Sequence, residues 1–452
     1  MSTRVILVRH GQSSFNKERR IQGRLDKSVL TEKGCTAATQ VGAMLGSIAF
    51  ESAYCSPLQR AKQTAEIILS SIKNPPPLQA TNQLMEIDLP LWEGMLRSEV
   101  LEKFPENYRC WQEQSDKFCM AVLSNESEVQ HFPVLAIFEN ARHFWQDVLP
   151  RHSGGTILVV AHNGINRALI GSAIGIPPAY YHSIQQSNCG ITVLNFPSLL
   201  ATSSEVGGDM GAVQLESMNL TSHVGEIFPK PREGHRGPRL LLVRHGETDW
   251  NKAGKFQGQI DVPLNDNGRE QSRRAAEFLK EVKLDFAISS SMLRPKETAE
   301  IILQHHPEVE LQLNNELREI SHGLWEGKFE SEIEQSYPGL LDEWKTAPQN
   351  VQMPEGENLQ EVWERAIVAW KNIVASASGT GIVVAHDAIN KAILCHLFGL
   401  EPEHFWKFKQ GNGAVTVIDY PNGPEGLPVL QAMNITTHLS GGILDKTAAG
   451  AL

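Results

Sequence analysis

The apolar positions of this chain form short runs that end abruptly in polar residues, and the whole pattern occurs twice. The run Val5–Val8 leads directly into Arg9–Gly11, and Leu240–Val243 leads into Arg244–Gly246. Short apolar runs bounded in this way predict buried strands. One Arg-His-Gly tripeptide arises easily by chance, but two copies with the same apolar lead-in predict a duplicated domain.

Helix and strand patterns then recur in the same order through both halves. Thr31 and Asn265 are predicted N-caps, and each precedes apolar residues at helical spacing. Later matched segments are Cys55–Leu69 with Ser289–Leu303, Met85–Gly94 with Arg318–Gly327, and Thr156–Leu169 with Thr380–Ile393. Each half closes with two strand-like segments, which are predicted to pair with each other.

The alternation of strands and helices predicts an α/β fold in each half, with a mostly parallel central sheet flanked by helices. The repeat also sets the expected organisation. We expect a first domain at 1–224, a linker at 225–238, a second domain at 239–440 and an unstructured tail at 441–452. The linker is assigned because that stretch is rich in proline and charge.

Composition restricts the partners of the protein. The formal net charge of −11 argues against nucleic acid, which requires a basic face. No apolar run approaches the roughly 18 residues of a membrane span, and the start of the chain does not resemble a signal peptide. Cysteines without any C-x-x-C spacing predict free thiols and a cytoplasmic protein. The oligomeric state stays open.

Polar residues follow the predicted strands in both halves. The ligand of an α/β sheet binds beyond the carboxyl ends of its strands, so these residues are expected to share a pocket. They are His10, Arg60 and His162 in the first half, and His245, Arg294 and His386 in the second half. Each half therefore predicts a strand-end site that contains two histidines and at least one arginine.

This residue set suits phosphate chemistry. Guanidinium groups match phosphate oxygens and disfavour protonation of nearby histidines, which leaves an imidazole lone pair free to attack phosphorus. Glu86 or Glu319 could protonate the leaving alkoxide and then activate water. Taken alone, each residue has a plainer interpretation: a hydrogen-bonded structural histidine, a surface arginine or a capping carboxylate. Trp92 and Trp325 are predicted to be core residues. The recurrence of the whole set in order favours function.

The motifs of both halves closely resemble the histidine phosphatase superfamily, over essentially the whole chain. They include Val8–Gly11, Ser56–Ala65, Leu91–Gly94 and Val160–Gly164, with their second-half counterparts. The resemblance implies two tandem phosphoglycerate mutase-like domains, with His10 and His245 as phosphorylated nucleophiles. It implies further catalytic residues Arg9, Arg60, Glu86 and His162, with Arg244, Arg294, Glu319 and His386, and binding residues Asn16, Gln22, Gly23, Asn163, Asn251, Gln257 and Gly258. It implies no metal and no other cofactor.

Several residues depart from the family pattern, and they restrict the reaction and the substrates that we expect. The Glu-Arg-x-Tyr-Gly run of cofactor-dependent mutases is missing after both glutamates, which favours hydrolysis. Met353–Asn358 is similar to a substrate loop of the family, whereas the first half has His131–Trp145 there, so the two halves are expected to differ in substrate. Asp387 replaces the Asn163 amide and places a carboxylate near the phosphate. Three phenylalanines of the first half, Phe132, Phe138 and Phe144, are expected to form an apolar substrate wall or helix core.

The expected partner is a small phosphorylated metabolite, and the expected reaction is metal-independent hydrolysis of its phosphate ester. The two-copy plan and Gln186–Phe196 resemble a branch of the family that acts on a sugar-acid phosphate, 2-carboxy-D-arabinitol 1-phosphate. Hydrolysis of phosphoserine, α-ribazole phosphate or another sugar phosphate stays open, as does phosphoglycerate mutation. A further alternative is that one half is a non-catalytic regulatory module that binds a phosphometabolite.

Overall fold

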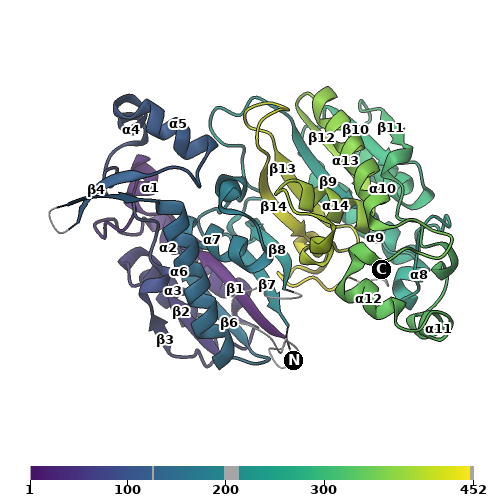
Figure 1. The fold of residues 1–452 in the computed structure, drawn as a ribbon, viewed down its shortest axis with the longest axis horizontal. Helices are drawn as coiled ribbons and strands as arrows, with labels where there is room; N and C mark the ends of the chain where they lie inside the picture. The colour runs from purple at the N-terminus through teal and green to yellow at the C-terminus, as the bar shows by residue number, and fades with distance from the viewer. Residues whose placement is uncertain (1, 125–126, 198–212, 448–452) are drawn as a thin grey trace. The chain divides into compact units, whose positions relative to one another are not determined.

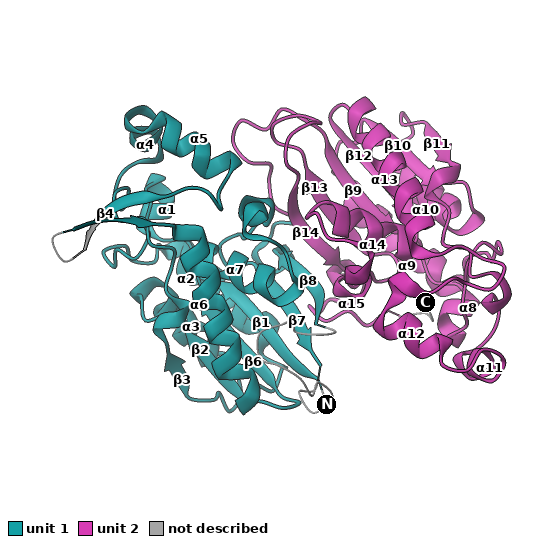
Figure 2. Cartoon of the chain, in the orientation of Figure 1, with its two compact units in different colours: residues 1–226 teal, residues 227–452 magenta. Residues whose placement is uncertain are grey.

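The computed structural model describes residues 2–124, 127–197 and 213–447 (Figure 1). The chain divides into two compact units, Met1–Glu226 and Ile227–Leu452 (Figure 2). This boundary falls inside the stretch predicted as a linker, 225–238. Each unit is an α/β structure with a mixed, mostly parallel sheet, which confirms the predicted fold class.

The sheet of the first unit has the order β8-β7-β1-β6-β2-β3. These strands are β1 (Thr3–Arg9), β2 (Ser52–Cys55), β3 (Leu78–Ala80), β6 (Thr156–Ala161), β7 (Ile191–Phe196) and β8 (Gln214–Leu220). Strands β1, β6, β2 and β3 are parallel to one another, and β7 is antiparallel to both β1 and β8. The closing pair of strands predicted for this half is therefore confirmed.

The helices of the first unit include two packed pairs, α2 with α3 and α6 with α7. The α-helices are α1 (Ser14–Glu18), α2 (Glu32–Leu45), α3 (Gln59–Ser70), α4 (Arg97–Lys103), α5 (Pro105–Glu113), α6 (Pro133–Val148) and α7 (Asn163–Ile174). Short 3₁₀ helices are η1 (Asn82–Leu84), η2 (Leu149–Arg151), η3 (Pro178–Ser183) and η5 (Ser222–Val224). A separate antiparallel hairpin, β4 (Met120–Ser124) and β5 (Ser127–His131), precedes α6.

The second unit repeats this plan with the strand order β11-β10-β12-β9-β13-β14. Its strands are β9 (Arg239–Arg244), β10 (Phe286–Ser290), β11 (Leu311–Asn314), β12 (Thr380–Ala385), β13 (Val415–Asp419) and β14 (Val429–Ile435). Strands β9 to β12 are parallel, and β13 is antiparallel to β9 and β14. The repeat read from the sequence is thus a repeat of topology.

The helices of the second unit follow the same order. They are α8 (Asp249–Ala253), α9 (Asp266–Leu279), α10 (Leu293–Leu303), α11 (Glu330–Ser336), α12 (Leu340–Thr346), α13 (Leu359–Ser376), α14 (Asp387–His396) and α15 (Thr437–Ser440). The 3₁₀ helices are η6 (Asn315–Leu317), η7 (Gly323–Trp325), η8 (Pro348–Asn350) and η9 (Pro402–Lys407). Both predicted N-caps are confirmed, because the side chains of Thr31 and Asn265 accept hydrogen bonds from the third residue of α2 and α9.

The core of each unit is formed where helices cover the sheet. Trp92 and Trp325 are buried, as predicted. Phe138 and Phe144 are also buried, 2% and 0% exposed, which favours the second of the two interpretations given for them, helix core, over a substrate wall. The helical period of α6 turns both rings inward, and Phe138 packs where a Cβ added at Gly171 of α7 would lie 3.0 Å from its ring.

The described part of the predicted tail, residues 441–447, forms no helix or strand but contacts the rest of the second unit, as the preceding helix α15 does. His438 of α15 stacks on Phe278 with 4.7 Å between ring centroids, and Ile443 is buried. The Asp445 carboxylate accepts hydrogen bonds from Thr447 and Asn434. A carboxylate held this way fixes the segment against the second unit. Residues 448–452 lie outside the described residues.

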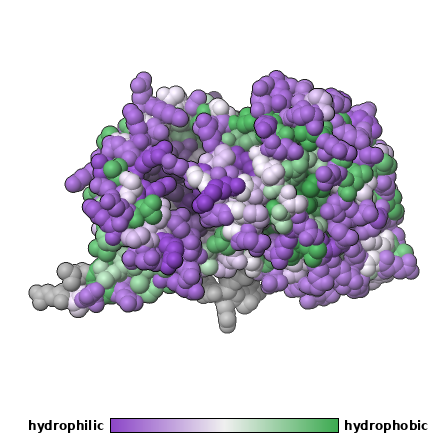
Figure 3. All heavy atoms as spheres, turned by 90° about the horizontal axis from the view of Figure 1, so that it is seen from above, coloured by the Kyte–Doolittle hydropathy of each residue, from purple (hydrophilic) through white to green (hydrophobic). Residues whose placement is uncertain are grey.

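The chemistry of the surface agrees with the composition. The face shown in Figure 3 is mostly hydrophilic, with apolar residues in smaller patches. Among the described helices, none is long and apolar enough to cross a membrane. All six cysteines are free, as predicted.

Replacing Phe138 by Ala should lower the free energy of unfolding by about 3–5 kcal/mol, because the change leaves a cavity between α6 and α7. The measurement is urea unfolding followed by tryptophan fluorescence. Leu135→Ala on the exposed side of the same helix is the control, and it should change stability by roughly 0.5 kcal/mol or less. Unchanged stability with weakened ester binding in Phe138→Ala would restore the substrate-wall interpretation.

Candidate active sites

The carboxyl ends of β1 and β6 bring two histidines together in the first unit. The ring centroids of His10 and His162 lie 5.1 Å apart, and both rings are buried. The second unit repeats this with His245 and His386, also 5.1 Å apart. The pairing predicted from strand-end positions is therefore present in both units.

A backbone hydrogen bond fixes the tautomer of the first histidine of each pair. His10 Nδ1 lies 2.7 Å from the Gly11 carbonyl, and His245 Nδ1 lies 2.7 Å from the Gly246 carbonyl. A carbonyl oxygen only accepts, so Nδ1 carries the proton and Nε2 of the neutral ring keeps its lone pair. Each ring is thus oriented as a nucleophile or hydrogen-bond acceptor through Nε2.

Burial and neighbouring charge keep these rings neutral. Burial, and after it the charges of Arg60 and Arg9, holds the pKa of His10 well below its ordinary value. Burial likewise lowers the pKa of His162, where Arg60 is the largest charge contribution. In the second unit, burial followed by Arg294 lowers the pKa of His245 in the same way. An unprotonated imidazole is therefore available at neutral pH.

The arginine on the first turn of α3 is clamped by the preceding loop. Arg60 is fully buried, and its Nη2 and Nη1 donate to the carbonyls of Gly23 (2.9 Å) and Leu25 (3.2 Å). Arg294 of α10 is held by Gly258 and Ile260 in the same manner. The two glycines thus contribute their backbone carbonyls to the site. Gly23 also leaves room for Glu93, because a Cβ at this position would lie 2.1 Å from Glu93 Oε1.

The arginine that ends β1 faces the same space. Arg9 Nη1 donates to the Gln186 carbonyl at 2.8 Å, while Arg9 Nε has no partner among the described residues. The Nε of Arg60 and Nδ1 of His162 are likewise buried without partners in this part of the structure. Buried polar atoms normally have hydrogen-bond partners, so several unpartnered donors at one place indicate an anion site.

The two glutamates are placed differently. Glu86 Oε1 accepts hydrogen bonds from the backbone N–H groups of Gly164 (2.9 Å) and Ile165 (3.2 Å) at the start of α7. A Cβ on Gly164 would lie 2.4 Å from that oxygen. Ala388 occupies this position in the second unit, and the hydrogen bond recorded for Glu319 comes from the N–H of Ile320. The glycine of the first unit is what admits the carboxylate to the helix end.

The second glutamate is an acid near neutrality. Burial, and after it the charge of Asp387, raises the pKa of Glu319 to about 7. A carboxyl with this pKa can donate and accept a proton at physiological pH. Arg294 acts in the opposite direction on Glu319, and its own pKa falls to about 10, mainly because of burial, which still leaves it charged.

The remaining predicted residues shape the loop around the site. Asn16 Oδ1 accepts from Ser13 and so closes the capping box of α1, which leaves its amide N–H₂ for other contacts. Gln22 Oε1 accepts from the hydroxyls of Ser13 and Ser28. Asn251 and Gln257 make the equivalent bonds to Thr248 in the second unit.

Two asparagines were missed by the sequence reasoning. Asn188 donates to the His10 carbonyl (2.9 Å) and to Asn16 Oδ1 (3.2 Å), and Asn412 makes the same two bonds in the second unit. Both stand at the same place in the repeat, just before β7 and β13. The matched position was the signal that could have found them.

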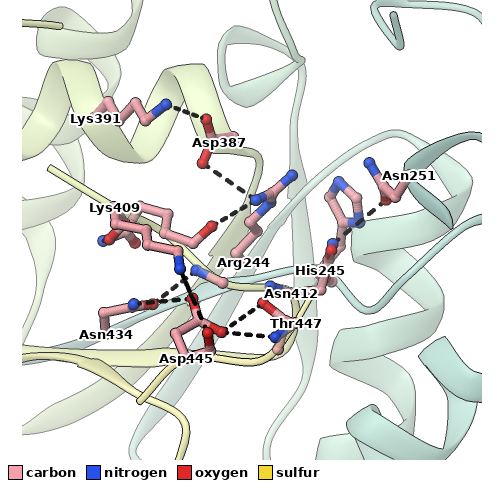
Figure 4. A network of polar contacts seen from close by, with 12 residues as sticks. Arg244, His245, Asn251, Asp387, Lys391, Lys409, Asn412, Asn434, Asp445 and Thr447 are labelled. Atoms are coloured by element: carbon pink, nitrogen blue, oxygen red, sulfur yellow. Dashed lines mark hydrogen bonds and ion pairs between the residues drawn. The ribbon is translucent and has the colours of Figure 1, made fainter. Parts of the chain in front are cut away.

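A network of ion pairs surrounds the second site (Figure 4). Asp387 Oδ1 lies 3.3 Å from Arg244 Nη1, and Asp387 Oδ2 lies 2.6 Å from Lys391 Nζ. On the other side, Thr447 Oγ1 accepts from the Asn412 N–H at 3.2 Å. The tail therefore supports the loop that carries Asn412.

The loops over the two sites differ, as predicted. Glu357 of the Met353–Asn358 loop pairs with Arg365 (2.8 Å) and accepts from the Ser321 N–H. In the first unit His131 at the end of β5 hydrogen-bonds the Asp88 carbonyl at 3.1 Å. Among the described residues, no group of three or more His, Cys, Asp or Glu is placed to hold a metal ion.

A mostly parallel α/β unit with buried histidine and arginine pairs at its strand ends defines a class of proteins that handle phosphate groups. The chain belongs to the histidine phosphatase superfamily (branch 1), whose model matches residues 5–199 and 240–436. It is therefore a hydrolase of this family, built from two such domains.

Full-length relatives share the tandem plan. The chain is 31% identical over 457 residues to 2-carboxy-D-arabinitol-1-phosphatase of Triticum aestivum, covering 96% of this chain and 86% of the relative. A probable 2-carboxy-D-arabinitol-1-phosphatase of Arabidopsis thaliana is also 31% identical, with 96% and 88% covered. Phosphoserine phosphatase 1 of Hydrogenobacter thermophilus is 31% identical over 202 residues, 44% of this chain and 94% of that protein.

Replacing Asp387 by Asn should lower the pKa of Glu319 by roughly 1 unit, because a buried negative charge beside that carboxyl is removed. The measurement is a pH titration of the ¹³C carboxyl resonance of Glu319. Glu308→Gln, at the exposed turn after α10, removes one charge far from the site and should leave the titration unchanged. An unshifted titration in Asp387→Asn would show that burial alone sets this pKa.

Proposed function

We propose that each unit hydrolyses the phosphate ester of a small metabolite through a phosphohistidine, formed on His10 in the first unit and on His245 in the second. The single observation that carries this proposal is the Nδ1–H hydrogen bond to the next carbonyl, combined with burial between arginines. It leaves a neutral, fixed Nε2 lone pair beside guanidinium groups suited to a phosphate.

In the first step, the phosphate oxygens lie against Arg9, Arg60 and His162, and His10 Nε2 attacks phosphorus. The N–P bond forms as the ester P–O bond breaks, and the departing alkoxide takes a proton from Glu86. Preorganised donors stabilise the charge on the equatorial oxygens, and each such donor is worth about 3–4 kcal/mol. The second unit uses Arg244, Arg294, His386, His245 and Glu319 in the same roles.

In the second step, water attacks the phosphorylated histidine. The glutamate, now ionised, takes a proton from that water, the N–P bond breaks, and inorganic phosphate leaves with the imidazole restored. The pKa of Glu319, about 7, suits both the donation and the uptake of a proton. Neither step uses a metal ion, because arginines and histidines neutralise the phosphate.

The loop residues complete the phosphate pocket in this proposal. The amide N–H₂ groups of Asn16 and Asn251 contact phosphate oxygens, since their Oδ1 atoms are already used in capping. Asn163 contributes its amide at the start of α7. Gln22-Gly23 and Gln257-Gly258 line the mouth of each pocket.

For the substrate of the protein we propose a sugar-acid phosphate such as 2-carboxy-D-arabinitol 1-phosphate. The support is the full-length similarity to two plant proteins of that description, which extends over both units. Phosphoserine is a second candidate, because 44% of the chain is 31% identical to a phosphoserine phosphatase, the same identity as to the plant proteins. The different loops over the two sites support different substrates in the two units.

Removing one nucleophile should abolish hydrolysis at one site only. His10→Ala and His245→Ala should each eliminate one set of activities by at least about 10³-fold and spare the other, and the double variant should be inactive. The measurement is phosphate release across a panel of phosphorylated sugar acids, hydroxy acids, sugars and amino acids. Loss of every activity in His10→Ala, with His245→Ala silent, would make the second unit a binding or regulatory module.

Chelation should leave the activity intact, whereas vanadate should inhibit it, because vanadate adopts the five-coordinate geometry of the transferring phosphorus. The measurement is the initial rate with EDTA, with EDTA followed by excess Mg²⁺, and with vanadate. Loss of activity with EDTA that Mg²⁺ restores would contradict a mechanism based on histidine and arginine alone.

A further inference from the structure

The two sites differ in one buried charge at the first residue of the helix that follows the second histidine. In the second unit this residue is Asp387, which is 2% exposed and lies between Arg244 and Lys391 (Figure 4). In the first unit the same position is Asn163, an uncharged amide. The carboxylate that separates two cations in one site is thus missing from the other.

The cations themselves are retained in the first unit. Arg167 stands where the second unit has Lys391, and it is 6% exposed. Its Nη1 contacts His182 Nδ1 at 3.2 Å and its guanidinium lies over the Tyr181 ring, but its Nε has no partner among the described residues. Burial, and among the neighbouring charges that of Arg167, lowers the pKa of Arg9, and burial lowers the pKa of Arg167. No ion pair between a carboxylate and either arginine is present among the described residues.

The two sites therefore differ in the net charge of their buried side chains. In the described part of the first unit, the carboxylates that act on Arg9, Arg60 and Arg167 are those of Glu86, Asp26 and Glu93. In the second unit the corresponding cations are Arg244, Arg294 and Lys391, and the carboxylates are those of Glu319, Asp261, Glu326 and Asp387. The first three of these match the three of the first unit, so Asp387 is the difference. Further out, Arg24 pairs with Asp88 and Arg365 pairs with Glu357, so these pairs add no net charge.

A buried cation without a counter-charge is costly, and an anion that approaches it recovers part of that cost. Phosphate binds at the strand ends of both sites, so the surplus in the first site is left for a second anionic group. Asn163 is partly exposed, and the Nε of Arg9 is a buried donor with no partner in the described structure. A carboxylate beside the ester would meet the Arg9 guanidinium and the Asn163 N–H₂ there.

We propose that the first site selects phosphate esters that carry a carboxylate close to the ester, and that Asp387 removes this preference from the second site. The proposal rests on the hydrolytic function proposed above and names the chemical class that each site accepts. Phosphorylated sugar acids and hydroxy acids fit the first site. Esters of polyols and of amine-bearing alcohols fit the second site, where a further negative charge would meet the Asp387 carboxylate.

The test compares 3-phosphoglycerate with glycerol 3-phosphate, in which a hydroxymethyl group replaces the carboxylate. The full chain with His245→Ala reports on the first site, and the full chain with His10→Ala reports on the second. The measured quantity is the ratio of kcat/KM for 3-phosphoglycerate to that for glycerol 3-phosphate. We expect this ratio to be about tenfold higher for the first site, the scale of one unpaired charge at short range.

Exchanging the two residues should exchange the preference. Asn163→Asp in the first site should lower the ratio about tenfold, and Asp387→Asn in the second should raise it about tenfold. Asn74→Asp, on the exposed turn after α3, and Glu308→Gln, on the exposed turn after α10, make the same charge changes far from the sites. These controls should leave both ratios unchanged.

Equal ratios at the two sites that neither exchange alters would overturn the charge selection and leave the hydrolytic function intact. Failure of both sites to hydrolyse any ester would count against the hydrolytic function instead. In that event the charge proposal is tested by binding. The dissociation constants of the two esters are measured by calorimetry with the full chain carrying both His10→Ala and His245→Ala. Asn163→Asp should weaken binding of 3-phosphoglycerate about tenfold more than binding of glycerol 3-phosphate, and equal weakening of both esters would overturn it.

Discussion

The hydrogen bond from a histidine Nδ1 to the carbonyl of the following glycine is the interaction on which both sites depend. It sets the tautomer and direction of the ring, and it needs a chain that turns sharply at the strand end. A Cβ on Gly11 would lie 2.5 Å from the Gly34 carbonyl, so this turn also requires glycine where the strand meets α2. Burial, and after it the charges of the arginines, then keep the ring neutral, and the rest of each unit places these groups.

Sequence reasoning located the strand-end residues because a parallel sheet gathers such residues at one edge, whatever the loops do. The repeat supplied the second copy of each. Asn188 was missed because its partner His10 is 178 residues away, and no local pattern reports a bond of that range. For Phe138 the sequence left two interpretations, substrate wall and helix core, because a helix period does not show which face α7 covers. The contacts of the tail could not be predicted, because Asp445 bonds to Asn434 of β14, which lies outside the segment.

The two units share the residues of the phosphate pocket but differ in the residues that contact the glutamate. Gly164 lets a helix end bind one glutamate, and Ala388 leaves the other to be set by burial and by Asp387. Both changes leave the histidines and arginines of the phosphate pocket in place, and one of them gives Arg244 an ion-pair partner in Asp387. Between the two copies, the histidines and arginines of the phosphate pocket are therefore the same, and the residues that contact them differ.

The hydrogen bond from the Asn412 N–H to Thr447 connects the segment after α15 to the second site. Asn412 carries the bonds to His245 and Asn251, so a residue in a segment that resembles a loose appendage steadies the loop beside the nucleophile. A substitution at Thr447 would therefore act on the pocket from outside it, through the position of Asn412. By its contacts, the stretch from Asp445 to Thr447 is part of the second site.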